Sequence, residues 1–270
     1  MRIFNATEKI GSGDFSVRLP VNPKKRLRNE YDVIFENINR LAEQLSGIET
    51  LRQDFVSNVS HEFKAPLSVI ENSGTILMKR DLSEKDRLKY AKNVSDASKR
   101  LAVMITNILK LNNLETQKIF TRNDKINLPE QLKEEILLFE QVWNEKNIDI
   151  DIASEDTVII MGDRELLSLM WSNLLSNAFK FTPRNGSVRV EITGDAENVY
   201  VSVSDTGEGI PEEKQQRIFE KFYQCDTSHV TAGNGLGLAL VKTIADIFGY
   251  RITVKSTVGK GSTFTVCLSR

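Results

Sequence analysis

The chain has 270 residues, enough for two domains or for one domain with an extended helical part. Its hydrophobic fraction of 40% suits a packed core, and its net charge of -1 gives no electrostatic case for nucleic acid as the main partner. Two cysteines are too few for a disulfide framework, and no apolar run approaches the roughly 20 residues that span a bilayer, so we expect this stretch to be soluble and to function in a reducing compartment.

Residues 1–30 are predicted to form a short helical start followed by a connector, because glycines and prolines interrupt any regular element there. The connector carries a basic run that consists of Lys24, Lys25, Arg26 and Arg28. Such a run could contact anionic lipid head groups. We favour the alternative of a solvated connector, because short basic runs are common.

A long helix is predicted from Tyr31 to about Met78. Apolar residues recur along it every three or four positions, which is the spacing of a coiled-coil seam, with Arg52 as one interruption. The seam consists of Ile34, Ile38, Leu41, Leu45, Ile48, Phe55 and Val59. Pro66 lies inside the same helix and removes one backbone hydrogen bond, so we expect a bend at that point.

A second helix is predicted to begin after Ser83, which we expect to cap it, with Glu84 and Asp86 in its first turn. Its apolar stripe consists of Leu88, Ala91, Val94, Leu101, Ile105, Ile108 and Leu111. Two long amphipathic helices with a short connection form an antiparallel hairpin, and such hairpins often dimerise into four-helix bundles. A seam that enters from upstream favours a parallel dimer.

The second half of the chain mixes helical and strand patterns. Helices are predicted over residues 127–146, 163–180 and 236–248, and strands over 148–152 and 157–163. SVRVEIT and VYVSVSD alternate with period two around GDAEN, and RITVKS and STFTVCL do so around TVGKG, so each pair is predicted to form a hairpin. We therefore expect an α/β sandwich of sheet and helices, joined to the helical half by a polar linker near residues 115–125.

His61 lies about 200° around its helix from Val59, so it is predicted to face away from the seam and into solvent. Neutral imidazole is a nucleophile, and Glu62 could hydrogen-bond one ring nitrogen and leave the other free to attack. An ordinary surface histidine is the alternative. His229, the other histidine of the chain, lies in a polar loop, and we interpret it as a surface residue.

Two glycine-rich motifs in the second half suit a nucleotide. DTGEGI, residues 205–210, follows a strand, and its glycines let the backbone approach a ligand closely. GNGLGLAL, residues 233–240, opens a helix whose N-terminal N–H groups suit phosphate oxygens. The polar stretch between them has the length of an active-site lid. Either motif alone could be an ordinary turn.

One helix face supplies a further set of polar groups. Asn173, Asn177 and Lys180 stand at i, i+4 and i+7, so they share this face while apolar residues cover the other side. An amide oxygen is a suitable hard ligand for Mg²⁺, which prefers to keep several waters and to bridge phosphates. Lys180 would offer a point charge to those phosphates.

Taken in order, these motifs resemble those of sensor histidine kinases of bacterial two-component systems, over nearly the whole chain. VSHEFKAPL resembles the phospho-acceptor histidine box, and NLLSNAFKFTP resembles the asparagine box. DTGEGI and GNGLGL resemble the two glycine boxes, IFEKFY the phenylalanine box, and GKGSTF the final glycine motif of the Bergerat-type ATP fold. The opening GDFSVRL … NEYD resembles a truncated HAMP-type linker domain.

The resemblance implies a multidomain fold, in which an all-α helical hairpin forms a dimeric four-helix bundle and is followed by an α/β sandwich of the Bergerat ATPase type. Its implied parts are a HAMP-like linker with the start of a signalling helix (1–46), the dimerisation and phosphotransfer hairpin (47–115), a linker (116–126) and the catalytic ATP-binding domain (127–270). The chain would then be the cytoplasmic part of a sensor anchored in the cell membrane upstream of residue 1.

The implied activity is ATP-dependent autophosphorylation of a homodimer, followed by transfer of the phosphoryl group to an aspartate of a response regulator receiver domain, with ATP and Mg²⁺ as cofactors. His61 would accept the γ-phosphoryl group, and Glu62 would be the base that orients and activates it. Asn177 would coordinate Mg²⁺, while Asn173 and Lys180 would contact the metal or the phosphates.

The resemblance also implies how the nucleotide is held. Asp205 would accept a hydrogen bond from the adenine amino group, and Gly207 and Gly209 would leave room for the base. Gly233, Gly235 and Gly237 would hinge and cap the lid, and Phe219 and Phe222 would anchor it against the core. The remaining implied nucleotide contacts are Phe181, Ile210, Leu236, Leu238 and Thr263.

One departure from the family pattern concerns a second activity. Many relatives carry Thr or Asn four residues after the histidine, where it is held to position water for dephosphorylating the partner, whereas this chain has Ala65. We therefore expect weak or absent phosphatase activity. The motif before the long helix also differs, with Tyr31 and Asp32 in place of an apolar residue and glycine.

Two alternatives remain at this point. A different ATPase of the Bergerat fold, which uses ATP for clamp closure, would lack the helical hairpin that bears His61. A non-catalytic dimeric signalling scaffold would have a degenerate nucleotide site, whereas every implied ATP contact is present in this sequence.

Overall fold

The computed structural model describes residues 2–21, 30–117, 120–155, 157–195, 197–225 and 234–269. The basic run in the connector, His229 and Gly233 lie outside the described residues. The chain divides into two compact units, Met1–Ala65 and Pro66–Arg270, so the division falls at the proline inside the long helix. The bend expected there stays a prediction.

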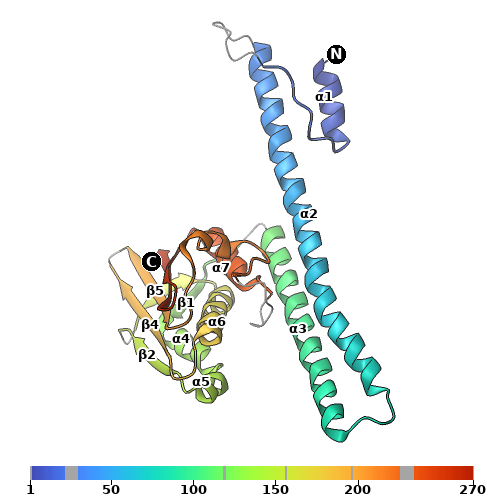
Figure 1. The fold of residues 1–270 in the computed structure, drawn as a ribbon. Helices are drawn as coiled ribbons and strands as arrows, with labels where there is room; N and C mark the ends of the chain where they lie inside the picture. The colour runs from blue at the N-terminus through green and yellow to red at the C-terminus, as the bar shows by residue number, and fades with distance from the viewer. Residues whose placement is uncertain are drawn as a thin grey trace. The chain divides into compact units, whose positions relative to one another are not determined.

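In the first unit, helix α1 (Arg2–Gly11) is followed by a connector that is tied to helix α2 (Glu30–Leu77) (Figure 1). The N–H of Leu19 donates to Oδ1 of Asn39 at 2.7 Å, and Nδ2 of Asn39 donates to the carbonyl of Leu19 at 2.8 Å. Ala6, Leu19 and Ala42 are the buried apolar residues of this unit among those that the structure describes. The long helix predicted from Tyr31 to about Met78 is confirmed.

The second unit contains the last turns of α2 and helix α3 (Glu84–Thr116). Ser83 caps α3 as predicted, because its Oγ accepts the N–H of Asp86 at 3.1 Å. Many apolar side chains on the two long helices remain exposed in the single chain. They include Ile34, Leu41, Leu45, Ile48, Val56, Leu67, Val69, Leu88, Val103, Ile105 and Leu109.

A five-stranded sheet follows, with strand order β2-β4-β5-β7-β6. Its strands are β2 (Asp149–Ala153), β4 (Ser187–Gly194), β5 (Asn198–Asp205), β6 (Arg251–Thr257) and β7 (Gly261–Ser269). Strand β2 runs parallel to β4, and the other neighbours are antiparallel. Both predicted hairpins, β4–β5 and β6–β7, are therefore confirmed.

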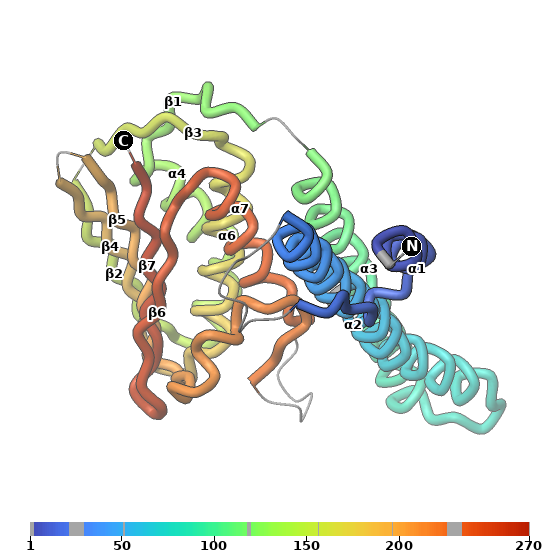
Figure 2. The backbone as a smooth tube through the Cα atoms, turned by 90° about the horizontal axis from the view of Figure 1, so that it is seen from above, coloured from blue at the N-terminus to red at the C-terminus, as the bar shows by residue number. Residues whose placement is uncertain are grey.

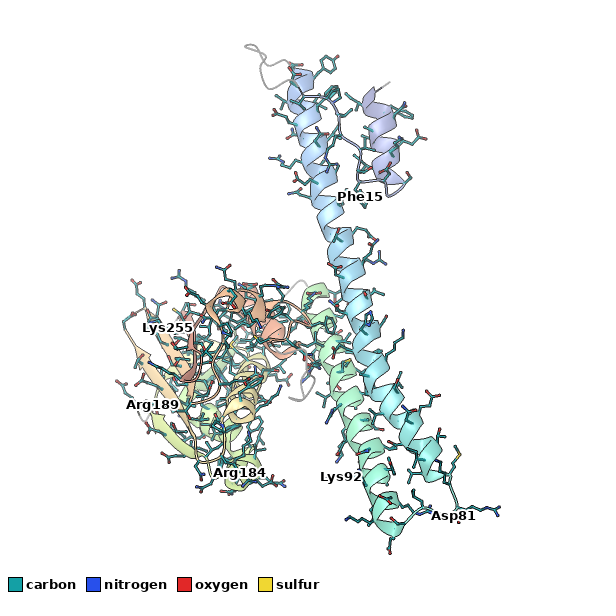
Figure 3. All side chains as sticks on the ribbon, in the orientation of Figure 1. Phe15, Asp81, Lys92, Arg184, Arg189 and Lys255 are labelled. Carbon is teal, nitrogen blue, oxygen red and sulfur yellow. The ribbon has the colours of Figure 1, made fainter. Side chains whose placement is uncertain are left out.

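Helices cover one face of this sheet, as Figure 2 shows for α4 (Leu128–Leu137), α6 (Arg164–Phe181) and α7 (Gly237–Phe248). Trp171 and Leu175 of α6 and Leu240 of α7 are fully buried between helices and sheet, because alternate strand residues and one face of each helix are apolar. The opposite face of the sheet carries polar side chains, including Arg189 of β4 and Lys255 of β6, which Figure 3 labels.

The prediction of one continuous helix over residues 127–146 is wrong. It is broken at Leu138 and Phe139 into α4 and α5 (Glu140–Lys146). The Phe139 ring lies 5.4 Å from that of Phe179 in α6, and the Trp143 ring lies 5.9 Å from it. The break lets both rings pack on Phe179, so tertiary packing overrides the local helical pattern.

The end of the predicted polar linker is a strand. β1 (Asp124–Asn127) pairs antiparallel with β3 (Ile159–Gly162) in a separate two-stranded sheet. Ile126 is fully buried there. Because DKIN is short and polar, only its partner strand reveals it. The predicted boundaries of the four parts of the chain stay predictions.

The linker is also anchored within the second unit. The guanidinium of Arg122 lies 5.4 Å from the ring centroid of Phe248 and 5.1 Å from that of Tyr250, and it donates to the carbonyl of Phe248. On α3, the Glu115 carboxylate pairs with Lys221 at 2.5 Å. The contacts of Arg122 hold the linker against the C-terminal end of α7, and the Glu115–Lys221 pair ties the end of α3 to the segment that precedes α7.

Candidate active site

The predicted polar face of α6 is present, and it meets the start of α7. Nδ2 of Asn173 donates to the carbonyl of Leu169 at 2.7 Å. Its Oδ1 lies so close to Gly237 that a Cβ added there would be 2.8 Å away. Asn177, one turn further on, is half-buried and has no hydrogen-bond partner among the described residues. Its amide is therefore available to a ligand.

Lys180 continues this face toward the DTGEGI loop. Its Nζ lies 4.4 Å from the ring centroid of Phe181. Burial lowers the pKa of Lys180, and the carboxylate of Glu208 opposes that shift. The ammonium group is therefore held at the border between α6 and the loop, where a bound phosphate would stabilise its charge.

Asp205 ends strand β5 with one carboxylate oxygen bound and the other available. Its Oδ1 accepts the N–H of Gly207 at 2.8 Å and the N–H of Ser262 at 3.3 Å, while Oδ2 has no partner among the residues that the structure describes. Burial raises the pKa of the Asp205 carboxyl, and the two N–H groups oppose that shift. A half-buried acceptor of this kind suits an amino group of a ligand.

The glycines of the first motif allow this loop to pack closely. A Cβ on Gly207 would lie 2.7 Å from the carbonyl oxygen of Phe181, at the end of α6. Gly209 has a φ of +72°, and a Cβ there would lie 2.1 Å from the carbonyl oxygen of Thr257. The loop is thus wedged between α6 and the end of β6.

The second motif begins helix α7. Gly235 accepts the N–H of Phe222 at 2.9 Å, which closes the base of the loop between the motifs. Leu236 is fully buried, so it fixes the start of α7 in the core, and Leu238 is half-buried. Phe219 packs edge-on against Phe264 with the ring centroids 6.5 Å apart. The role of Phe219 and Phe222 as anchors of a lid stays a prediction.

The structure corrects one predicted nucleotide contact. Thr263 pairs with Ser204, and its Oγ1 lies 2.9 Å from the Ser204 hydroxyl on the open face of the sheet. Asp205 pairs with Ser262, and successive residues of a strand point to opposite faces. Ser262, not Thr263, is therefore on the face of Asp205. Counting back two residues from the buried Phe264 would have found it.

His61 and Glu62 belong to the first unit. The His61 side chain is exposed on α2, in agreement with the prediction, and Glu62 is half-buried. Neither side chain has a hydrogen-bond partner among the described residues, so the activation of the imidazole by Glu62 stays a prediction.

The donor set fits Mg²⁺ held mainly through phosphates. The described residues contain no group of three or more histidine, cysteine or carboxylate side chains that could hold a metal. The available amide of Asn177, with Asn173 one turn away, is the kind of hard but sparse ligand set that Mg²⁺ accepts when phosphates complete its coordination.

Comparisons with known proteins identify both parts. The His Kinase A (phospho-acceptor) domain matches residues 51–117, and the Histidine kinase-, DNA gyrase B-, and HSP90-like ATPase matches residues 162–270. The chain is 31% identical over 266 residues to the Heme sensor protein HssS of Staphylococcus saprophyticus, covering 98% of this chain and 56% of that protein. For HssS of Staphylococcus aureus the identity is 30% over 264 residues, covering 97% and 56%. The chain thus spans about half the length of the curated relatives it matches.

Solved structures agree. Full-length ShkA in complex with AMPPNP has a TM-score of 0.58 and 26% identity, covering 80% of this chain and 45% of that one. Histidine kinase ThkA in complex with response regulator protein TrrA has a TM-score of 0.68 at 24% identity, covering 91% and 68%, and supports the fold alone. With a phospho-acceptor domain followed by an ATPase domain of this class, the chain belongs to the family of bacterial sensor histidine kinases.

Proposed function

We propose that the chain transfers the γ-phosphoryl group of ATP to His61 and then to an aspartate of a response regulator receiver domain. The convergence of α6, the DTGEGI loop and the start of α7 carries this proposal, since it gathers an adenine acceptor, a cation and the two amides of Asn173 and Asn177, of which Asn177 has no partner among the described residues, within one domain. ShkA, a solved relative with 26% identity, binds AMPPNP, which supports ATP as the ligand.

In this proposal, the Asp205 carboxylate accepts a hydrogen bond from the adenine amino group, and the N-terminal N–H groups of α7 donate to phosphate oxygens. Asn177 holds Mg²⁺, with Asn173 and Lys180 at the metal or the phosphates. The ion supplies charge neutralisation on the phosphates when bound. Phosphoryl transfer needs chiefly positioning and charge neutralisation, and these groups provide both.

His61 acts as the nucleophile. A neutral ring nitrogen attacks the γ-phosphorus, a P–N bond forms, and the P–O bond to the leaving ADP breaks. Glu62 accepts the proton of the other ring nitrogen and so balances the charge that develops on the imidazole.

The long helices support a homodimer. Four exposed apolar side chains of α2 lie on the predicted seam, namely Ile34, Leu41, Leu45 and Ile48, and a second copy would bury them. ThkA forms a complex with the response regulator protein TrrA, and a receiver domain is the partner that we propose for this chain. The tie between the connector and Asn39 supports a HAMP-type linker. Among the helices that the structure describes, none combines the length and the hydropathy of a membrane-spanning segment.

The test is incubation of the chain with Mg²⁺ and γ-labelled ATP. Label that resists alkali and is lost in acid would establish a phosphohistidine. Label with the opposite stability would place the phosphoryl group on another residue type. ATP binding without any label would favour the non-catalytic scaffold.

Ala65→Thr is predicted to raise phosphatase activity. Position 65 is exposed and lies one helical turn after His61, so a hydroxyl there fits without a clash and could orient a water. We expect dephosphorylation of a labelled receiver domain to become about tenfold faster. Ala65→Val, which has the same shape without the hydroxyl, is the control. An equal gain in both variants would contradict the role of the hydroxyl.

A further inference from the structure

The DTGEGI loop is braced from outside by a side chain that no motif contains. Nε2 of Gln215 donates to the carbonyl of Ile210 at 2.9 Å and to the carbonyl of Ser256 at 3.0 Å. The N–H of Ile210 donates to Oγ of Ser256 at 2.7 Å. Both backbone groups of Ile210 are thus bound to the pair Gln215 and Ser256. Gln215 directly follows the 3₁₀ helix η1 (Glu212–Lys214).

The two preceding residues of the loop, Glu208 and Gly209, are held against the end of β6 and the turn that follows it. The N–H of Gly259 donates to the carbonyl of Glu208 at 2.7 Å. Gly209 packs on the carbonyl of Thr257 so closely that no Cβ would fit. The loop is therefore bound at three consecutive residues to the end of β6 and the turn that follows it.

Hydrogen bonds connect the end of β6 to Asp205 through Ser262. Ser256 and Ser262 lie opposite each other in the β6–β7 ladder, with their hydroxyl oxygens 2.9 Å apart. Ser262 also donates its N–H to Asp205 Oδ1. One side of Asp205 is thus fixed by the strands, and its other side by the loop that Gln215 braces.

Glutamine is suited to this place. Its amide nitrogen has two hydrogens, which matches the two carbonyls that converge on it, whereas an apolar side chain would leave both carbonyls unpaired. Gln215 and Ser256 also line a surface cavity of about 400 Å³. Water can therefore reach these carbonyls if the amide is removed, so its loss should loosen the loop without unfolding the domain.

We propose that Gln215 is a positioning residue for nucleotide recognition: it fixes the Gly209–Ile210 turn and thereby the geometry in which Asp205 selects adenine. This role rests on the proposed ATP binding. Guanine presents a carbonyl oxygen where adenine has its amino group, and that oxygen would face the Asp205 carboxylate. Rejection of guanine therefore requires that the loop cannot shift away, and the brace supplies this rigidity.

The test compares Gln215→Leu with Gln216→Leu, its exposed neighbour, in the full chain. In Gln215→Leu we expect the Kd for ATP to rise about tenfold and the Kd for GTP to change less. The preference of the site for ATP over GTP should therefore become smaller. The KM for ATP should rise with kcat at saturating ATP within about twofold of wild type. Gln215→Lys, which keeps several donors on a long stem, should restore part of the affinity.

Amide hydrogen exchange at Ile210, measured without nucleotide, tests whether Gln215 rigidifies the loop independently of whether the chain binds ATP. Exchange should quicken in Gln215→Leu and stay unchanged in Gln216→Leu. Unchanged exchange, or unchanged affinity and selectivity in a chain that binds ATP, would overturn the positioning role. Wild-type chain that binds no ATP would overturn the proposed function and this role together.

Discussion

The variant His61→Gln is expected to incorporate no label from γ-labelled ATP. Glutamine has no ring nitrogen that can attack phosphorus, and its amide nitrogen is not nucleophilic because its lone pair is delocalised. The site at Asp205 and α6 lies in the other unit and does not contain residue 61, so ATP affinity should stay at the wild-type value. Phosphorimaging and a binding titration would measure the two quantities on the same preparation.

His229→Gln is the matched control, since it changes the other histidine of the sequence in the same way, and it should keep the wild-type level of label. Glu62→Gln should keep the acceptor but slow labelling at least about 100-fold if Glu62 is the base. Equal label in His61→Gln and wild type would move the acceptor to another residue and contradict the proposed mechanism.

The variant Asp205→Asn is expected to lose ATP affinity by about 100-fold. Oδ1 of Asp205 accepts two backbone N–H groups, so the amide oxygen of asparagine must take that place. The NH₂ group of asparagine then occupies the place of Oδ2. Since both this group and the adenine amino group are hydrogen-bond donors, the hydrogen bond to adenine is lost. Isothermal titration with ATP would measure the loss, and Asp149→Asn, at an exposed aspartate, should bind as wild type does.

The same substitution is expected to raise thermal stability at pH 7. Burial raises the pKa of the Asp205 carboxyl in the folded chain, so the stability that its protonated form contributes is complete below the unfolded pKa and is lost as the pH rises through the folded pKa. Asparagine does not titrate and keeps that contribution. The gain in Tm should therefore be largest near pH 7 and shrink toward about pH 4.

A lower Tm for Asp205→Asn at pH 7, or a difference that grows in acid, would contradict the burial argument. Unchanged ATP affinity would remove Asp205 from adenine recognition. A joint result of weaker binding and higher stability would show that the site retains a buried charge for function at the expense of the fold.

Local signals in the sequence predicted most of the helices and strands and named the residues of the candidate site. The period of the apolar residues gave the long helices and both hairpins, and the choice of residue gave the Ser83 cap, because these signals act within one or two turns. The sequence also predicted the shared face of Asn173 and Asn177 on α6, because their spacing is one helical turn. It predicted the close approach of the DTGEGI loop to its neighbours, because glycine has no side chain to prevent it.

Only the tertiary structure decided features that depend on a partner far along the chain. The break between α4 and α5 follows from rings that pack on Phe179, and β1 exists because β3 pairs with it. Thr263 and Ser262 differ by one position, yet the register of β7 against β5 places them on opposite faces. Gln215 carries no local signal at all, since two carbonyls from separate segments converge on its amide only after the chain has folded.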